Sequence, residues 1–216
     1  MNQDELKELV AREALKHVQD AIVGVGSGST VFKFIDALAT IKGRIEGAVA
    51  ASEASAERLK KHGIRVFDLN SVDELPVYVD GADEVTEHLH MIKGGGGALT
   101  REKIVAAVAR KFVCIVDGTK LVDVLGRFPL PIEINPFAAE LTRRQIDLTV
   151  EMLGLTQARS SWRMATGEAL LRTDGGHMIL DLACVAIPDA DQLAAALDMI
   201  PGVVEHGLFI GYADIV

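Results

Sequence analysis

Acidic side chains follow a short apolar segment near the middle of the chain. Residues 77–79 are Val-Tyr-Val, and Asp80-Gly81-Ala82-Asp83-Glu84 comes directly after them. Ligands of open α/β sheets bind beyond the carboxyl ends of the strands, which is where this loop would lie. Two carboxylates three residues apart can share protons or bind vicinal hydroxyl groups, and joint desolvation raises the pKa of one of them. By itself the loop also fits a solvated acidic turn, or a magnesium site if a further ligand lay nearby.

Four successive glycines form a second candidate, in the sequence Lys93-Gly94-Gly95-Gly96-Gly97-Ala98-Leu99-Thr100-Arg101-Glu102. Such a run loses much conformational entropy on folding, which favours a functional reason for it. A lysine before the run and a helix after it make an oxyanion or phosphate site plausible. Glu102 would lie in the first helical turn, where the helix dipole favours an acid. Because Lys103 stands three residues after Thr100, a capping box is absent and Glu102 is available for other work.

A third candidate is the turn Gly24-Val25-Gly26-Ser27-Gly28-Ser29-Thr30, between a strand and a helix. Its glycines allow close backbone approach, the helix start offers free N–H groups to an anion, and Ser27, Ser29 and Thr30 add hydroxyl donors. The turn is not a dinucleotide fingerprint, because Ser29 occupies the position of the third glycine, and no Walker A lysine follows. The alternative is a tight turn with Ser29 or Thr30 as the N-cap.

Two further groups carry weaker signals. Asp117-Gly118-Thr119-Lys120 follows an apolar strand, so Lys120 either reaches an anion or lies on the surface after a turn. His88-Leu89-His90 has the spacing of a metal-binding pair. A third ligand is not evident for that pair, so we expect a solvated loop and no metal site.

Composition excludes several classes of protein. The net charge of −9 over 216 residues argues against a nucleic-acid-binding protein, and any phosphate site must reverse that field locally. No uncharged apolar run approaches the ~18 residues of a membrane span. The start of the chain is acidic and polar, unlike a signal peptide. The two cysteines lie in apolar contexts and form no Cys-x-x-Cys pair. We therefore expect a reduced, cytoplasmic protein.

Periodicity predicts the elements that position these groups. Helices are expected over 4–18, 31–38, 54–61 and 100–109, and strands over 21–25, 48–50, 65–67, 76–79 and 112–116. Strands that alternate with helices through short links indicate an α/β fold with a doubly wound, mostly parallel, Rossmann-like sheet.

Prolines change the pattern beyond residue 127. Pro129, Pro131 and Pro136 cannot continue a helix or a central strand, so we place a domain boundary there. Helices are expected over 137–153 and 190–199, with strand-like segments over 161–164, 169–172 and 178–182. These predict a second, smaller α+β (ferredoxin-like) domain over 128–199. The Rossmann-like catalytic domain would comprise 1–127 plus 200–216, with 203–210 rejoining the first sheet.

In their order and spacing, the four motifs resemble those of ribose-5-phosphate isomerase of the A type. Further similarity runs through 128–133, 174–181 and 200–204, so the likeness covers nearly the whole chain. The glycine run that ends in Thr-Arg-Glu is its most specific part.

The resemblance implies interconversion of ribose 5-phosphate and ribulose 5-phosphate through an enediolate, with neither metal nor organic cofactor. It implies that Glu102 is the base, and that Asp80, Asp83 and Lys93 bind O1 and O2, help to open the ring and stabilise the enediolate. It implies that residues 27–30 hold the phosphate, with some help from Lys7. The substrate-binding residues would be Ser27, Gly28, Ser29, Thr30, Asp80, Gly81, Ala82, Asp83, Lys93, Gly94, Gly95, Gly96 and Lys120. It also implies a homodimer or homotetramer.

Other functions stay open at this point. A sugar-phosphate sensor of a transcription regulator would bind without converting, but residues 1–20 supply one helix and no DNA-binding module. An amino-sugar-phosphate deaminase or a coenzyme A transferase could use a similar sheet. A nicotinamide enzyme is disfavoured by Ser29.

Overall fold

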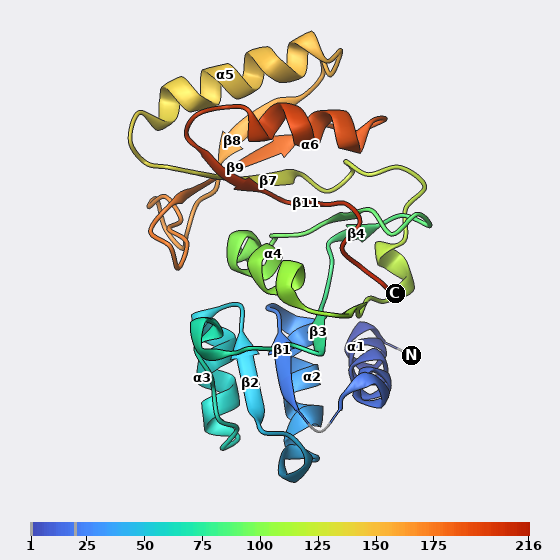
Figure 1. Ribbon diagram of the computed structural model, residues 1–216. Helices are drawn as coiled ribbons and strands as arrows, with labels where there is room; N and C mark the ends of the chain where they lie inside the picture. The colour runs from blue at the N-terminus through green and yellow to red at the C-terminus, as the bar shows by residue number, and fades with distance from the viewer. Residues whose placement is uncertain (1, 20) are drawn as a thin grey trace. The chain divides into compact units, whose positions relative to one another are not determined.

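The structure, a computed structural model, describes residues 2–19 and 21–216; Met1, with which the expected first domain begins, and Asp20 lie outside this description. The chain forms two compact units. The first comprises Met1–Ala82, Arg101–Leu121 and Gly211–Val216, and the second comprises Asp83–Thr100 and Val122–Ile210. Figure 1 shows their elements along the chain.

The first unit contains a parallel sheet of four strands in the order β2-β1-β3-β6. These strands are β1 (Ile22–Val25), β2 (Gly47–Ala50), β3 (Val77–Asp80) and β6 (Phe112–Cys114). The expected strand 65–67 forms one parallel bridge, from Val66 to Ala48, at the outer edge beside β2. The helices of the first unit are α1 (Gln3–Ala14), α2 (Ser29–Ala39), α3 (Glu53–Lys61) and α4 (Leu99–Val108). Four 3₁₀ turns accompany them, at Leu15–His17, Lys42–Arg44, Leu69–Ser71 and Gly118–Lys120.

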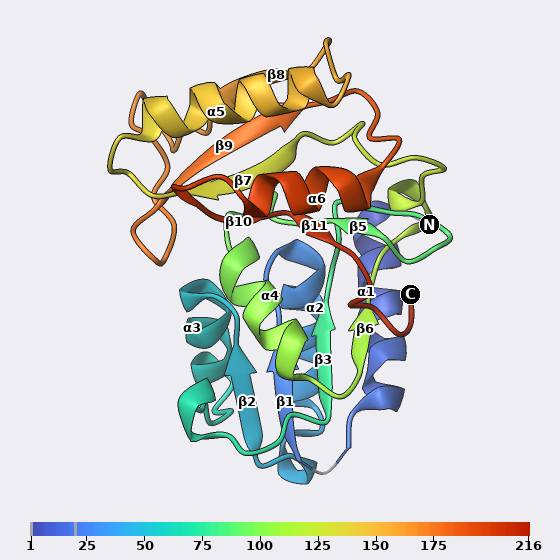
Figure 2. The same ribbon diagram turned by 45° about the horizontal axis from the view of Figure 1, so that its top comes forward.

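Alternation along the strands gives this sheet two different faces. Val23, Val25 and Val77 belong to the apolar core that α1, α2 and α3 share. The residues between them face α4, because a Cβ on Gly24 would lie 3.0 Å from the Tyr78 side chain and 3.2 Å from that of Val105 in α4. Figure 2 shows α4 in front of β1 and β3, with α2 behind them. The loops that follow β1 and β3 therefore lie near the start of α4.

The second unit contains two antiparallel sheets, β10-β7-β9-β8 and β11-β5-β4. The strands are β4 (Glu84–Val85), β5 (Met91–Ile92), β7 (Leu130–Ile134), β8 (Arg159–Trp162), β9 (Met178–Ala183), β10 (Val203–His206) and β11 (Leu208–Phe209). Two helices, α5 (Ala139–Met152) and α6 (Ala190–Asp198), pack on the larger sheet, and Ile146, Leu193 and Leu180 lie in their shared core.

Two expectations about this unit were wrong. Segment 203–210 does not rejoin the parallel sheet, because β10 pairs with β7 and β11 pairs with β5. Pro131 lies within β7, which has neighbours on both sides. The Pro131 carbonyl accepts a hydrogen bond from the Gly207 N–H, so the backbone of Pro131 faces the end of β10. The missing N–H of the proline would point to the same side. The proline is therefore tolerated, because β7 loses no hydrogen bond to β9.

The fold class is confirmed: a parallel, Rossmann-like sheet is accompanied by an antiparallel α+β unit. The compact units divide the chain differently from the domains expected at 127 and 200. Residues 83–100 and 200–210 fall in the second unit, since they supply the strands β4, β5, β10 and β11. Among the described helices, none has the length and apolar character needed to cross a membrane.

Candidate active site

A buried carboxylate joins the ends of β1 and β3. Asp80 is 0% exposed, and its Oδ1 accepts hydrogen bonds from the N–H groups of Ser27 (3.1 Å) and Gly81 (2.7 Å). Tyr78 donates its hydroxyl to Oδ2 at 2.5 Å. Burial, followed by the nearby charges of Asp80 and Glu102, raises the pKa of Tyr78, so the phenol stays a donor. These hydrogen bonds replace the bonds to water that the Asp80 carboxylate loses when it is buried.

Gly26 makes this arrangement possible. A Cβ at position 26 would overlap the Asp80 carboxylate. The Gly26 N–H donates to the Val79 carbonyl at 3.0 Å, and the Gly26 carbonyl accepts from the Ser55 hydroxyl at 2.7 Å. The turn after β1 is therefore held on both sides, and this fixes the position of Ser27.

Ser27 connects the turn to α4. Its hydroxyl donates to Oε1 of Glu102, and Glu102 is 3% exposed. Glu102 lies in the first turn of α4, as expected. The preceding residue, Arg101, forms an ion pair with Glu53 at 2.8 Å. The structure thus brings together Ser27, Asp80 and Glu102, which come from three segments of the sequence.

The N-terminus of α2 lies next to this group. Gly28 is the N-cap, with φ of 95°, and no side chain among the described residues caps the helix there. The alternative with Ser29 or Thr30 as the N-cap is therefore wrong, because α2 starts at Ser29. Lys7 of α1 donates from Nζ to the Ser29 hydroxyl at 2.9 Å. Uncapped amides, hydroxyls and an ammonium group at a helix start are groups that can bind an anion.

In the second unit, Asp83 lies against the glycine run. Its Oδ2 accepts from the Gly95 N–H at 2.8 Å, and a Cβ on Gly95 would lie 2.7 Å from its Oδ1. Gly94 has φ of 104° and Gly97 has φ of 80°, a region that favours glycine. Gly95 and Gly96 are exposed, so the turn presents its backbone to solvent.

Lys93 is held through its backbone. It is 3% exposed, and its Nζ lies 5.4 Å from the centre of the Phe209 ring. Its N–H donates to the Gly207 carbonyl at 2.9 Å. Gly207 pairs with Pro131, which has no N–H to offer, so the Gly207 carbonyl is left for Lys93.

Arg163 is a residue that the sequence reasoning missed. It donates from Nη1 to the carbonyls of Gly94 (2.7 Å) and Gly95 (3.0 Å). Its other nitrogens form a two-bond ion pair with Asp181. Arg163 therefore fixes the direction of the peptides in the glycine run. An arginine within a strand-like segment, with an aspartate in the facing strand, was the signal available.

Glu84 and Asp117 make local hydrogen bonds. Glu84 is buried, and its carboxylate accepts from the N–H groups of Gly126 (2.8 Å) and Phe128 (2.6 Å). Asp117 caps the turn of Thr119, whose hydroxyl and N–H lower the Asp117 pKa, with Lys120 adding to the effect. Lys120 is half-buried beside that turn, in the first unit.

One group in the described part of the chain has the composition of a metal site. Ligand atoms of Asp198, Glu205 and His206 lie within 4.8 Å of one another. The Nδ1 of His206 accepts from the Leu208 N–H at 3.2 Å, so its proton is on Nε2, which is 3.2 Å from Asp198. A metal at Nε2 would need Nδ1 to carry a proton, and this hydrogen bond opposes that. His88 and His90 form no such group, and the His88 side chain is exposed.

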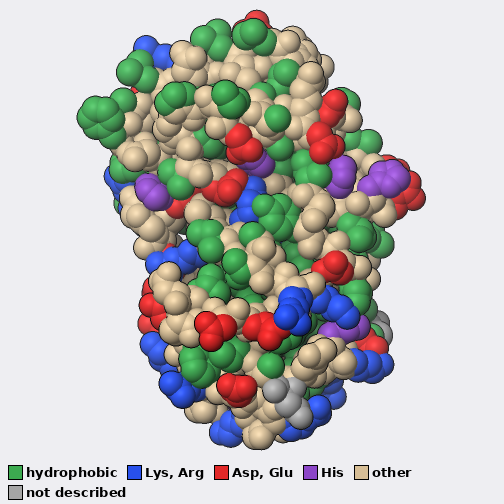
Figure 3. All heavy atoms as spheres, viewed as in Figure 1, with side chains coloured by type: hydrophobic (Ala, Val, Ile, Leu, Met, Phe, Trp, Pro, Cys, Tyr) green, Lys and Arg blue, Asp and Glu red, His purple; other side chains and the backbone are tan. Residues whose placement is uncertain are grey.

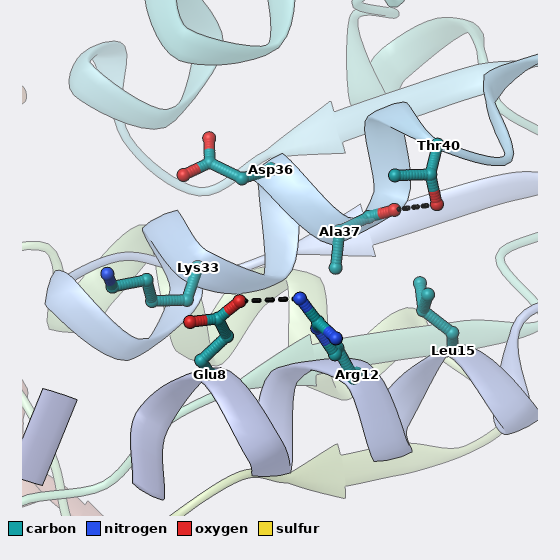
Figure 4. A pocket seen from close by; sticks show the side chains of 7 residues that line it. All are labelled: Glu8, Arg12, Leu15, Lys33, Asp36, Ala37 and Thr40. Carbon is teal, nitrogen blue, oxygen red and sulfur yellow. Dashed lines mark hydrogen bonds and ion pairs between the residues drawn. The ribbon is translucent and has the colours of Figure 1, made fainter. Parts of the chain in front are cut away.

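A hollow lined by charged side chains lies elsewhere, between α1 and α2 (Figure 4). Its charged groups are paired: Arg12 with Glu8 at 2.7 Å, Lys33 with Asp4 at 2.7 Å, and Asp36 with Arg58 and His62. Arg58 lowers the pKa of Asp36. The pairing leaves this hollow no residual charge that would recognise a phosphate, in contrast to the start of α2.

The family model of ribose 5-phosphate isomerase A (phosphoriboisomerase A) matches residues 47–216, which include β3, the glycine run and Glu102. The chain belongs to the ribose 5-phosphate isomerase A family. Membership makes it an aldose–ketose isomerase of pentose phosphates.

Solved structures of ribose 5-phosphate isomerases agree in fold over almost their whole length. The enzyme A of Neisseria gonorrhoeae is 40% identical, with a TM-score of 0.88 over 98% of this chain and 90% of the other. A D-ribose-5-phosphate isomerase in complex with phospho-erythronic acid is 38% identical, with a TM-score of 0.88 over 99% and 93%. The enzyme of Plasmodium falciparum is 31% identical, with a TM-score of 0.89 over 97% and 92%.

The residues expected from the isomerase family fall into two sets. The first set lies around the starts of α2 and α4 in the first unit and consists of Ser27, Gly28, Ser29, Thr30, Asp80, Gly81 and Glu102. Asp83 and Gly95 are in direct contact in the second unit, beside Lys93, Gly94 and Gly96 in sequence. Ala82 is the last residue of its segment of the first unit.

Proposed function

We propose that the chain interconverts D-ribose 5-phosphate and D-ribulose 5-phosphate by proton transfer through an enediolate, with Glu102 as general base. The observation that supports this most is the hydrogen bond from Ser27 to Glu102. It holds a buried carboxylate beside the turn that would hold the substrate phosphate. A base in this position contributes about 10²–10⁴-fold to such a reaction.

The phosphate would bind at the start of α2. Support comes from the uncapped amides after Gly28, the hydroxyls of Ser29 and Thr30, and the ammonium of Lys7. This local positive field offsets the net charge of −9. Holding the phosphate fixes the reacting carbons near the base, which is a contribution of proximity.

Lys93 would neutralise the oxygens on which charge develops. Removal of a proton beside a carbonyl places negative charge on oxygen, and a fixed ammonium lowers the energy of that state. Support comes from the hydrogen bond between its backbone and Gly207 and from the aromatic ring of Phe209 beside its Nζ. With a lysine in this role, we propose a reaction that needs neither metal nor organic cofactor.

The two aspartates would divide the remaining work. Asp83, partly exposed and bonded to Gly95, would bind the substrate hydroxyls and take part in ring opening. Asp80 is buried under three donors, which favours a role in positioning Ser27 close to the substrate oxygens. Backbone groups would contact the substrate at Gly81, Ala82, Gly94, Gly95 and Gly96. Lys120 would supply a second positive charge.

The biological setting follows from the same assignment. We propose a cytoplasmic homodimer or homotetramer whose partner is its pentose 5-phosphate substrate, and which binds neither nucleic acid nor membrane. The acidic net charge supports the exclusion of nucleic acid.

A coupled turnover assay with ribose 5-phosphate tests the proposal. We expect formation of ribulose 5-phosphate with excess chelator present. Binding without conversion would make the protein a sensor. Ammonia released from glucosamine 6-phosphate would indicate a deaminase, and a glutamyl thioester formed with an acyl coenzyme A would indicate a transferase.

A further inference from the structure

Helix α5 carries apolar side chains on two opposite faces. One face packs into the second unit, where Ala139, Ile146 and Val150 are buried. The other is open: Leu141 is 60% exposed, Leu148 is 54% exposed and Met152 is 86% exposed. Figure 3 shows hydrophobic side chains gathered over α5. The helix therefore buries one stripe within its own unit and presents a second to solvent.

Three of the exposed residues lie on one side of the helix. Leu141 and Leu148 are seven residues apart and Met152 is four further on, spacings that fall on the same side of a helix with about 3.6 residues per turn. Phe137, which is 87% exposed, lies just before the start of the helix. We call these four residues the α5 stripe. Exposed apolar side chains grouped on one side of a helix mark an interaction surface more often than a scattered exposed leucine does.

The spacing is that of a helix-pairing seam. Where two helices pack side by side, apolar residues recur at alternating intervals of four and three. The same intervals separate Leu141, Gln145, Leu148 and Met152. Gln145 is the polar exception, and a single polar residue in such a seam fixes the register of the pair. The 14 residues of α5 supply two heptads of contact.

The charges beside the α5 stripe identify the occupant. Arg144 and Glu151 lie on the same flank, seven residues apart. Within the part of the chain that is described, neither makes an ion pair, whereas Arg143, on the side of the helix away from the α5 stripe, lies 3.9 Å from both Glu140 and Asp147. If two copies of α5 run antiparallel, Arg144 of each copy faces Glu151 of the other. The flank is therefore complementary to itself about a twofold axis.

We propose that the α5 stripe is a self-association surface, on which α5 of a second copy packs antiparallel. The inference rests on the proposed homo-oligomer and adds to it the surface and the register. Burial of the four apolar side chains drives association, and the two Arg144–Glu151 pairs select the antiparallel orientation.

Solution mass, measured by light scattering after size exclusion, tests the surface. Leu148→Asp places two carboxylates in the seam, so we expect a mass below that of the wild type. Leu9→Asp on α1 is the matched control, because Leu9 is 53% exposed and lies outside the α5 stripe. It is expected to keep the wild-type mass. A monomeric wild type, or a Leu148→Asp variant of wild-type mass, would overturn the inference.

Charge reversal tests the orientation. Arg144→Glu and Glu151→Arg each place like charges together twice in the assembly, and we expect each to lower the mass at 50 mM salt. The double variant restores both pairs in the opposite sense and should regain the wild-type mass. A double variant that stays dissociated would overturn the antiparallel pairing. Turnover of ribose 5-phosphate, measured on the same samples, separates a failure of this surface from a failure of the proposed reaction.

Discussion

The backbone N–H of Lys93 donates a 2.9 Å hydrogen bond to the carbonyl oxygen of Gly207. The Gly207 N–H donates in turn to the Pro131 carbonyl at 2.8 Å, and Pro131 has no N–H that could compete for the Gly207 carbonyl. Close approach is possible because Gly207 has no side chain: a Cβ there would overlap the Lys93 carbonyl and lie 2.9 Å from Cδ of Pro131. Two residues distant in sequence from the lysine thus determine where its backbone lies.

The first prediction concerns this contact. Gly207→Ala must displace the backbone of Lys93, since the overlapping atom belongs to the main chain. A shift on the order of 1 Å can lower turnover about 10²-fold, so we expect a loss of at least tenfold in kcat/KM. Gly43→Ala is the control, because a Cβ there meets nothing within 4 Å. Equal kcat/KM in the two variants would contradict the role of Gly207.

The second prediction concerns Arg163. Arg163→Lys keeps a positive charge beside Asp181 but cannot also reach the carbonyls of Gly94 and Gly95. We expect kcat/KM to fall about tenfold while the melting temperature changes little. Arg159→Lys provides the comparison, because Arg159 also donates to backbone carbonyls but lies outside the glycine run. Wild-type kinetics in Arg163→Lys would show that the glycine run holds its shape without the guanidinium.

The parallel sheet could be predicted from the sequence because local signals agree there. Apolar strands such as 77–79 and 112–114 alternate with amphipathic helices, and each switch is marked by glycine or a polar turn. The second unit was harder. Pro131 indicates an interrupted segment, yet β7 is a central strand, because the position of the missing N–H depends on the neighbouring strand and not on local preference. The destination of β10 and β11 depends likewise on long-range pairing.

The candidate site shows the same division. Glu102, Asp80 and the turn at Ser27 could be found from residue type and position after a strand or before a helix. Their connection through the Ser27 hydroxyl could not, because it depends on how α4 packs over β1. Arg163 could not be predicted because its partners are the backbone carbonyls of Gly94 and Gly95, 69 and 68 residues away. Every residue has a backbone carbonyl, so the sequence does not indicate which ones accept a hydrogen bond from an arginine.

The third prediction concerns pH and Tyr78. Burial raises the Tyr78 pKa above its ordinary value of about 10, so the folded state keeps a proton that the unfolded state loses. The associated stability is complete below pH ~10 and is lost as the pH rises from there toward the folded pKa. The loss proceeds by up to about 1.4 kcal/mol per pH unit. Urea unfolding between pH 8 and 11 should show a steeper decline for the wild type than for Tyr78→Phe.

Tyr78→Phe also removes one donor from buried Asp80, so this variant should start about 1–3 kcal/mol less stable at pH 8. If the free energy of unfolding fell with pH equally in the two proteins, the prediction would be wrong. Tyr78 would then be ionised in the folded state, or its pKa would already be raised in the unfolded state.

The fourth prediction concerns the phosphate. Lys7→Met removes the ammonium beside Ser29 without disturbing the helix α1 that carries it. Because the phosphate is gripped equally in the ground and transition states, we expect KM to rise about tenfold with kcat nearly unchanged. Lys16→Met serves as the control, since Lys16 is ion-paired with Glu13 and its side chain is 70% exposed. A lower kcat at unchanged KM would place Lys7 in the chemical step instead.

The fifth prediction concerns the base. Glu102→Gln keeps the shape of the side chain and can still accept from Ser27, but an amide cannot take a proton from carbon. We expect kcat to fall at least 10²-fold while the sugar phosphate still binds. Ser27→Ala leaves the carboxylate and removes a donor to it, so its effect should be smaller, about tenfold. Glu53→Gln, which loosens the neighbouring Arg101 pair, should stay within twofold of the wild type. If Glu102→Gln turned over like Glu53→Gln, the proton would have to be taken by another group, and Asp83 would be the next to test.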